Sequence, residues 1–321
     1  MSKTISGTFG SNAKPAKGKR SKVSPSKVSS SKKVTSIYGS ATTHDIPVRQ
    51  INFEFSDDIP KYWFSGDPIR TMLLTALSCT FPEGERMFIR AVRRFEDKIS
   101  DPELKKQVRA FIGQEAHHGK QHEAFNQFMK RKGVATSYLE KYTKNGIAKE
   151  EQWLSPERML AKTCALEHFT ALYAETLLEH PELVAEIDER LQPLWIWHAL
   201  EESEHKAVAF DVYQNTVGSY WIRSSEMMFT SLLFTFFTVF HTVQLLHIDK
   251  TPVNLGKSAR RNLKELWKHR KVLGSLGKHY LAYYRPGFHP AKKDSAHLRQ
   301  HGLEQLNTLL EYLNKPSVSV G

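Results

Sequence analysis

The chain has 321 residues, of which 40% are hydrophobic and 11% aromatic, enough for one large globular domain or two small ones. Its net charge of +12 would suggest a nucleic-acid or membrane partner, but the charge is unevenly distributed. Residues 1–44 hold nine basic and no acidic residues, and residues 249–300 carry +10, so residues 45–248 have a net charge of −6. We therefore expect the chemistry in this acidic middle, and nucleic acid is not an expected partner.

Cysteine is rare, since Cys79 and Cys164 are the only two. Two thiols exclude a disulfide framework and a thiolate zinc site. The first residues lack the continuous apolar stretch of a secretory signal. These features predict a cytoplasmic protein that begins near Met1, with peripheral contact to the inner face of the membrane as an extension of that prediction.

Three regions are predicted along the chain. Residues 1–44 are rich in Ser, Lys, Gly and Pro and have few large apolar residues, which predicts a disordered basic tail. Residues 45–220 are predicted to form a helical bundle that contains a dinuclear metal site, and residues 221–321 a C-terminal helical extension.

Helical signals dominate from Asp67 onward, and strand-like alternation is scarce, which predicts an all-α bundle. Asp67-Pro68 and Ser155-Pro156 are typical helix starts, and Ser100-Asp-Pro-Glu103 is a capping box with proline in its first turn. The predicted helices are Pro68–Lys98 with a break at Pro82, Pro102–Lys132, Pro156–Glu179, Glu182–Val217 with a kink or restart at Pro193, Ser225–Ile248, and weaker helices in Leu255–Tyr283 and Ala296–Leu313.

Two of these helices carry Glu-x-x-His on their apolar stripe, as Glu115-Ala-His-His118 and Glu202-Ser-Glu-His205. The spacing of three residues places both side chains about one turn apart on the same helix face. Carboxylates and imidazoles on an apolar stripe are costly unless something neutralises or ligates them. Each motif is therefore a candidate pair of metal ligands.

The helix before each motif adds one glutamate on its apolar side, Glu85 and Glu167, at intervals of 30 and 35 residues from the motifs. Two helices with one Glu each and two with Glu-x-x-His form the ligand set of dinuclear carboxylate sites in helical bundles. This set predicts two iron ions, with manganese or zinc as alternatives. Satisfied core ion pairs are the competing interpretation.

On these residues, the stretch from Pro68 to Val217 resembles the ferritin-like di-iron carboxylate proteins. His198 precedes Glu202 by four residues, and His198-x-x-x-Glu202-x-x-His205 is similar to the di-iron arylamine N-oxygenases, in which a third histidine joins six ligands. This resemblance makes His198 a seventh candidate ligand. A core histidine bonded to a backbone carbonyl is the alternative.

The chain also resembles a bacterial family of predicted metal-dependent hydrolases. The resemblance rests on Phe-Pro-Glu-Gly-Glu85, on both Glu-x-x-His runs, and on Tyr-Arg-Pro-Gly-Phe-His289-Pro. A hydrolytic dinuclear site would usually contain more Asp and His. The glutamate-rich set instead favours oxygen activation.

Several neighbouring residues compete for these roles or support them. Glu83 competes with Glu85, and Glu201 competes with Glu202, but the second of each pair fits the apolar stripe or the motif better. Four other residues are expected to point elsewhere or to hydrogen-bond to ligands: His117 and Glu204 toward solvent or a neighbouring helix, and His122 and His168 as hydrogen-bond partners of ligands. No position relative to the metals is predicted for His289, and no catalytic residue beyond the ligands.

Residues Met227–Ile248 contain no charged side chain and are long enough as a helix to span a bilayer. Three interpretations remain open for them: a core or dimer helix, an in-plane membrane anchor, and a true span. The basic run that follows, from Lys257 to Lys271 with Trp267, is typical of a helix on anionic lipid or of a solvated helix.

The sequence thus predicts a dinuclear iron oxygenase or oxidase that uses O₂ and an external electron donor to oxidise a small or lipid-like substrate, such as an amine. Three alternatives stay open: a metal-dependent hydrolase with the same site, an iron-handling protein, and a membrane-associated binding protein. A homodimer is a further expected partner, because an exposed Phe-rich helix would favour one.

Overall fold

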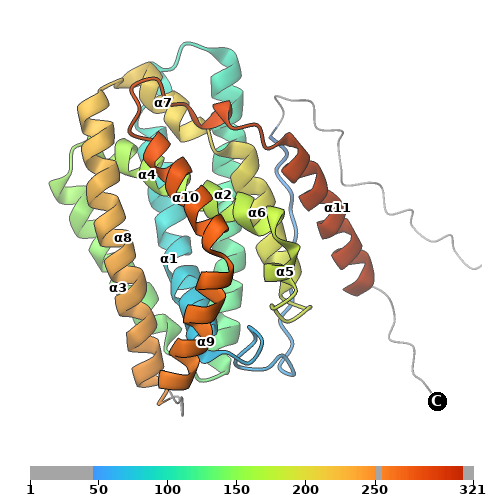
Figure 1. Ribbon diagram of the computed structural model, residues 1–321. Coiled ribbons are helices and arrows are strands. Elements are labelled where there is room, and N and C mark those ends of the chain that lie inside the picture. Colours follow the sequence, from blue (N-terminus) through green and yellow to red (C-terminus); the bar gives the residue numbers. More distant parts are fainter. Residues whose placement is uncertain (1–45, 251–254, 314–321) are drawn as a thin grey trace, which may run out of the picture. The chain divides into compact units, whose positions relative to one another are not determined.

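The computed structural model describes residues 46–250 and 255–313 of the chain (Figure 1). Within these residues helices are the only regular elements, apart from one isolated antiparallel bridge between Phe64 and Ile187. The all-α prediction is therefore confirmed. All described residues belong to one compact unit, and the predicted tail at 1–44 lies outside them.

The helices are, in chain order, α1 (Pro68–Arg93), α2 (Pro102–Arg131), α3 (Thr136–Trp153), α4 (Pro156–Glu179), α5 (Pro181–Val184), α6 (Gln192–His205), α7 (Val208–Thr216), α8 (Tyr220–Ile248), α9 (Leu255–Lys268), α10 (Arg270–Ala282) and α11 (Ala296–Leu313). Two short 3₁₀ turns, Glu96–Lys98 and Pro290–Lys292, complete the set.

Three of the long helices begin after a capping side chain, α1 and α4 at the predicted cap and α2 at Asp101 rather than at Ser100 of the predicted capping box. A side-chain oxygen of Asp67, Asp101 and Ser155 accepts a hydrogen bond from a backbone amide in the first turn, at 2.8, 2.9 and 3.4 Å. Each cap is followed by a proline, which has no amide hydrogen to leave unsatisfied at that position. Local sequence alone therefore sets the starts of α1, α2 and α4.

The predicted break at Pro82 is wrong, because α1 continues through it. A proline inside a helix leaves the carbonyl four residues earlier without its partner. Here that carbonyl belongs to Ser78 and accepts a hydrogen bond of 3.2 Å from the side-chain amide of Asn126 in α2. A contact between two helices thus replaces the missing bond within one.

Other boundaries also differ from the prediction. Helix α3 was not predicted, because its only buried residues are Thr136 and Leu139 and it has almost no apolar stripe to detect. The predicted helix Glu182–Val217 is three helices, α5 to α7, with interruptions before Gln192 and after His205. The restart expected at Pro193 is confirmed, since α6 begins one residue earlier.

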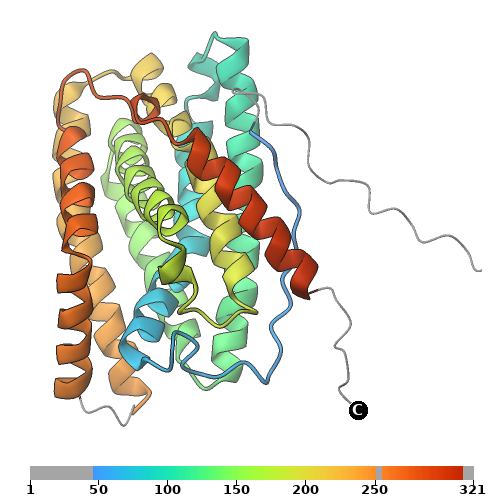
Figure 2. The same cartoon turned by 45° about the vertical axis from the view of Figure 1, so that its right-hand side comes forward.

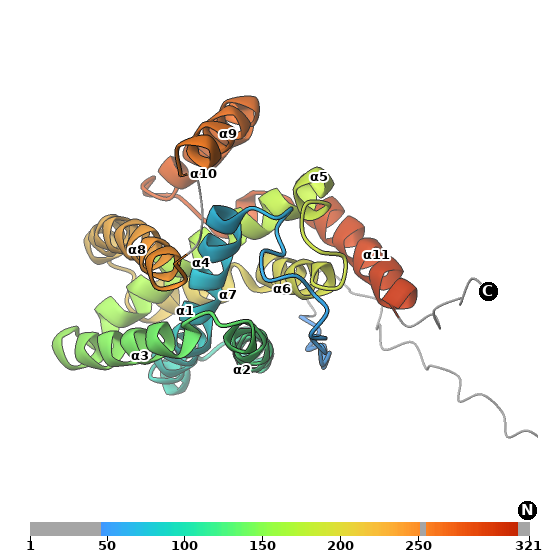
Figure 3. The same ribbon diagram turned by 90° about the horizontal axis from the view of Figure 1, so that it is seen from below.

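Helices α1, α2, α4 and α6, all within the acidic residues 45–248, pack together at the centre of the fold. Helix α3 packs on α1 and α2, α8 on α1 and α4, and α11 on α4 and α6. Viewed from below, α3 and α8 lie on one side of the molecule and α11 on the opposite side (Figure 3). Helices α9 and α10 run end to end along the edge (Figure 2).

Helix α8 is the one helix in the described part of the chain with the length and mean hydropathy (1.5) of a membrane span, which also occurs in soluble cores. Only 22% of its most apolar window is buried. It therefore packs on α1 and α4 with one face and leaves the other exposed, so the dimer-helix and membrane interpretations stay open. Its exposed face carries a continuous apolar stripe of Met228, Phe229, Leu232, Phe236, Val239, Phe240 and Val243.

Candidate metal centre

The structure brings all seven predicted ligands into one buried cluster between four helices. Each of these residues is 6% exposed or less. They are Glu85 on α1, Glu115 and His118 on α2, Glu167 on α4, and His198, Glu202 and His205 on α6. The helix stripes that predicted these residues therefore converge on one point.

Glu202 lies at the middle of the cluster. Its Oε1 is 3.0 Å from Nε2 of His198 and 3.5 Å from Nδ1 of His118, and its Oε2 is 3.5 Å from Nε2 of His205. One carboxylate thus faces three imidazoles, an arrangement that suits a carboxylate bridging two cations.

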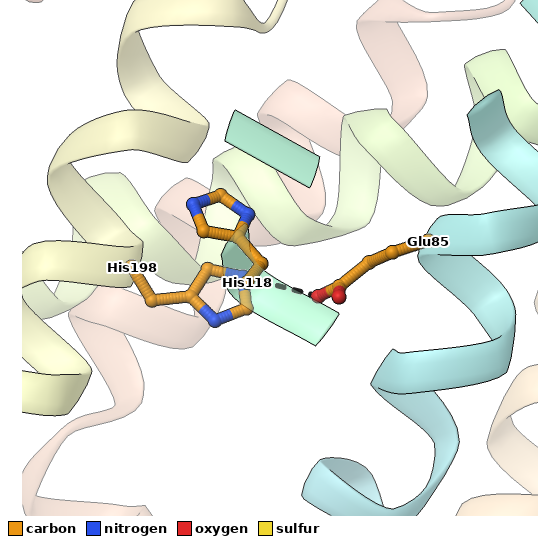
Figure 4. A group of neighbouring side chains, drawn as sticks. All are labelled: Glu85, His118 and His198. Carbon is orange, nitrogen blue, oxygen red and sulfur yellow. Dashed lines mark ion pairs between the residues drawn. The ribbon is translucent and has the colours of Figure 1, made fainter. Parts of the chain in front are cut away.

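The two ends of the cluster have different donors. At one end, Glu85 and His198 approach each other to 4.0 Å beside His118 (Figure 4). At the other end, Nε2 of His205 lies 3.1 Å from Glu115 and 3.4 Å from Glu167. Donor atoms within each group lie within 4.8 Å of one another. The cluster therefore offers two neighbouring positions for metal ions.

The buried donor atoms lack other partners. Neither carboxylate oxygen of Glu85, Glu115 or Glu167 accepts a hydrogen bond, and Nδ1 of His118 and Nε2 of His205 have no hydrogen-bond partner. Buried carboxylates without compensation are strongly unfavourable. Cations at the two positions would satisfy these atoms, so the residues present fit a dinuclear metal site.

The electrostatics of the metal-free cluster show the same deficit of positive charge. Burial, and then the charges of neighbouring carboxylates, raises the pKa of Glu85 and Glu115 well above the usual range. Burial and the charge of Glu202 raise the pKa of Glu167 to about 7. Although burial acts in the opposite direction, His205 and His198 hold the pKa of Glu202 well below its usual range. Without metal, these carboxylates compete for protons.

The helices approach each other closely at the cluster because α2 carries a glycine there. A Cβ atom at Gly119 would lie only 3.2 Å from Oε2 of Glu85. A side chain at this position would therefore require the Glu85 carboxylate to shift by a few tenths of an ångström.

Hydrogen bonds outside the cluster fix two of the histidines. His205 donates from Nδ1 to the side-chain oxygen of Gln114 (2.8 Å), which leaves Nε2 free to face the carboxylates. His118 donates from Nε2 to Glu201 (3.2 Å), which leaves Nδ1 free in the same way. Such contacts orient metal-binding imidazoles and select their tautomer.

Arg49 connects these two supports from the segment before α1. Its backbone amide and Nη1 donate to Glu201 at 3.3 Å, and its guanidinium forms two hydrogen bonds of 2.7 Å with Glu204. Glu204 in turn accepts from Gln114 at 3.0 Å. Glu204 thus faces a neighbouring helix, one of the two predicted directions, and Glu201 has its own role behind His118. Arg49 and Gln114 were not predicted, and the only sequence signal for them is the pair of further carboxylates on α6, Glu201 and Glu204.

The third histidine has a separate support. Nδ1 of His198 lies 2.6 Å from Nε2 of His122, whose other nitrogen lies 2.9 Å from Ser78 Oγ. This confirms His122 as a hydrogen-bond partner of a candidate ligand. His168 does not have this role, because its Nε2 contacts the backbone oxygen of His279 at 3.3 Å on the far side of α4. Consecutive side chains on a helix project about 100° apart, so His168 can face away from the cluster although Glu167 faces it.

Two remaining residues lie away from the cluster. Glu83 pairs with Arg86 and Arg90 on the surface, which leaves Glu85 as the buried member of that pair. His289 lies 2.7 Å from Asp211 and takes no part in the cluster.

A cavity of about 500 Å³ adjoins the cluster between α1, α3, α4 and α8. Glu85, His198 and Glu202 reach it from the metal side. Its remaining wall is mostly apolar and includes Phe81, Phe88, Leu233, Phe234 and Phe237. The volume and lining are those of a small-molecule site.

The fold and the cluster define an all-α protein with a carboxylate- and histidine-rich candidate metal centre. A family model described as "Predicted metal-dependent hydrolase" matches residues 47–294, and the chain belongs to this family. No curated protein and no solved structure matched the chain. The family match confirms the second resemblance drawn from the sequence, whereas the di-iron and ferritin-like details stay predictions.

Proposed function

We propose that the seven side chains bind two divalent first-row metal ions and form the catalytic site of an enzyme that acts on an apolar or amphiphilic small molecule. The unpartnered carboxylate oxygens and imidazole nitrogens of the cluster are the observation that carries this proposal. Glu85, His118 and His198 would hold one ion, Glu167 and His205 the other. The remaining two would lie between the ions: Glu115 and Glu202.

Hydrolysis is the first candidate reaction, because the family description names it. The ions would supply Lewis acidity, which polarises a carbonyl or phosphoryl group and makes water a nucleophile at neutral pH. The apolar wall of the cavity would bind the apolar part of the substrate and limit access of bulk water. The substrate's reacting group would meet the centre at Glu85, His198 and Glu202, which reach the cavity.

Oxygen-dependent oxidation is the second candidate, and the donor set favours it. Four glutamates and three histidines suit iron or manganese, and carboxylates tolerate a change of metal oxidation state. The ions would supply redox chemistry with O₂ and an external electron donor. The glutamate-rich donor set thus ranks this reaction first, whereas the family description favours the hydrolytic alternative.

Metal exchange separates the two reactions. Protein freed of metal is reloaded with Zn²⁺ or with Fe²⁺, and hydrolysis of p-nitrophenyl esters is measured without oxygen. For a hydrolase we expect activity with Zn²⁺ that Glu202→Ala abolishes. Oxygen uptake by the Fe²⁺ form with a reductant, together with an inactive Zn²⁺ form, would establish the oxidase instead. Failure of the full-length chain to bind either metal would refute the dinuclear centre.

We also propose that the apolar stripe of α8 rests on an anionic membrane surface, with the basic helix α9 at the lipid headgroups. Charge complementarity supports this occupant, because Arg260, Arg261, Lys264 and Lys268 lie exposed on the helix that follows. The cavity beside the metal centre is lined by the opposite side of α8, which includes Phe234 and Phe237. A lipid-like substrate would therefore reach the centre over a short path.

Vesicle sedimentation tests this contact. Vesicles of phosphatidylcholine with phosphatidylglycerol should sediment the protein, and the exposed substitutions Phe236→Ser and Phe240→Ser together should reduce the bound fraction roughly ten-fold. Tyr312→Ser on α11 is the control, since Tyr312 is also exposed but α11 lies on the opposite side of the molecule from α8. A dimer in sedimentation velocity that the α8 variant dissociates, without vesicle binding, would show that a second copy covers the stripe.

A further inference from the structure

A second cavity, of about 520 Å³, lies on the other side of α4 from the metal centre. Its walls come from α4, the residue after α6, α10 and the loop that follows α10, which crosses the end of the molecule in Figure 2. The loop contains the Tyr-Arg-Pro-Gly-Phe-His289-Pro motif, which the metal centre does not use. This motif therefore forms part of the wall of the second cavity.

The lining is strongly basic. It includes a single carboxylate, Glu175, and three imidazoles, those of His168, His279 and His289. Five cationic side chains also line it: Lys206, Lys278, Arg285, Lys292 and Lys293. A concave surface with one sign of charge focuses the electrostatic potential and concentrates ions of opposite sign.

The one carboxylate is already neutralised. Lys206 and Lys293 each place Nζ at 2.7 Å from a different oxygen of Glu175. Lys206 also donates to Ser295 Oγ (2.7 Å) and to a backbone oxygen (2.8 Å), so its buried ammonium is fully used. One wall of the cavity therefore has two ammonium groups, those of Lys206 and Lys293, that compensate the single carboxylate of Glu175.

The other cations have no anionic partner among the described residues. Lys292 donates only to the backbone oxygen of Gly287, at 2.6 Å, which is neutral. The side chains of Lys278 and Arg285 form no ion pair or hydrogen bond with the described part of the chain. Both are exposed at the cavity and available to a ligand.

The loop that carries Arg285 is held rigidly. The buried guanidinium of Arg223 donates to the backbone oxygens of Tyr283 (2.8 Å) and Arg285 (3.1 Å). His289 contacts Asp211 of α7 at 2.7 Å. A backbone that is already fixed lowers the entropy cost of binding, because only the side chain of Arg285 has to be ordered when a ligand arrives.

We propose that this cavity binds a phosphate group of an organic molecule. Arg and Lys recognise phosphate through charge-assisted hydrogen bonds, and the cavity is much larger than a bare phosphate needs. Ala171, Leu172 and Phe288 provide apolar wall for the organic part. The phosphate belongs to a soluble phosphate ester or to a phospholipid headgroup. The proposal is independent of the metal centre, since no candidate metal ligand lines the cavity.

Calorimetry on the full-length chain tests the site, with AMP and pyrophosphate as soluble probes. Wild-type protein should bind at least one probe, and Lys278→Gln with Arg285→Gln should weaken binding roughly ten- to hundred-fold by removing two charge-assisted contacts. The matched control is Arg109→Gln with Lys130→Gln on α2, which removes the same two residue types from elsewhere. Metal content and thermal stability should not change in either variant.

Vesicles distinguish the source of the phosphate. If neither soluble probe binds, sedimentation with phosphatidic acid vesicles should fall in the cavity variant and not in the α2 control, which would assign a lipid headgroup. Equal binding of probes and vesicles by the cavity variant and wild type would overturn the site, as would absence of binding to all of them.

Discussion

Glu85→Gln should raise the melting temperature of the metal-free protein and remove most of the stabilisation that metal ions provide. In the metal-free state, the Glu85 carboxylate is buried near three other carboxylates, and both of its oxygens lack hydrogen bonds. A neutral amide of the same shape relieves this repulsion. We expect an increase of roughly 2–4 °C, the shift that about 1 kcal/mol produces in a large domain.

The loss of metal stabilisation has the larger effect. A metal at 100 times its Kd adds about 2.7 kcal/mol to stability, and a variant with a hundred-fold weaker site loses most of that gain. Thermal unfolding with and without Zn²⁺, together with metal analysis, measures both changes. Glu83→Gln is the matched control, because Glu83 lies two residues away and pairs with surface arginines. Equal metal gain in Glu85→Gln and wild type would contradict the dinuclear site.

The pH dependence of the stability of the metal-free protein provides a second test of the same cluster. Glu167 has a folded-state pKa raised to about 7 by burial and Glu202, so the folded state binds protons more tightly than the unfolded chain. Its contribution to stability is complete below the ordinary carboxyl pKa and is lost as the pH rises through about 7. Metal ions replace those protons, so the metal-dependent rise in Tm should grow across this interval.

The starts of α1, α2 and α4 and the seven clustered residues could be predicted because their causes are local. A cap needs an Asp or Ser and a following proline, and Glu-x-x-His needs only the helix period. On α6, for example, Glu202 and His205 follow from their spacing on one face, whereas the resemblance to di-iron arylamine N-oxygenases was needed to add His198. Which side chains share a helix face depends on the helix period alone and not on the neighbouring helices.

Features that depend on contacts between residues far apart in the sequence could not be predicted from local patterns. The hydrogen bond from Asn126 that preserves α1 across Pro82 connects residues 48 positions apart. Arg49 contacts Glu201 and Glu204 across more than 150 positions, from a segment without helical periodicity. His168 was assigned to the centre because it is adjacent to Glu167, although consecutive residues on a helix point in different directions. Only the tertiary structure supplies these pairings.

Arg49→Gln should both destabilise the fold and weaken metal binding. Arg49 is 6% exposed, and its charge compensates the buried Glu201 and the half-buried Glu204 on the back of α6. Breaking a buried ion pair by removing one partner typically costs about 3–5 kcal/mol. Because the same contacts hold Glu201 against His118, metal affinity should fall roughly 10- to 100-fold. Denaturant unfolding and competition with a chelator measure the two effects.

Two further variants separate the effect of charge from that of positioning. Arg131→Gln removes an exposed arginine on α2 that lies 3.1 Å from Asp57, a residue of the same segment before α1 that contains Arg49. This variant should leave metal affinity unchanged. Adding Glu201→Gln to Arg49→Gln removes one uncompensated carboxylate while its amide oxygen still accepts from His118. The double variant should therefore recover stability relative to Arg49→Gln. If metal affinity also returns, Arg49 acts through charge alone; if it stays low, the guanidinium positions α6 and its histidines.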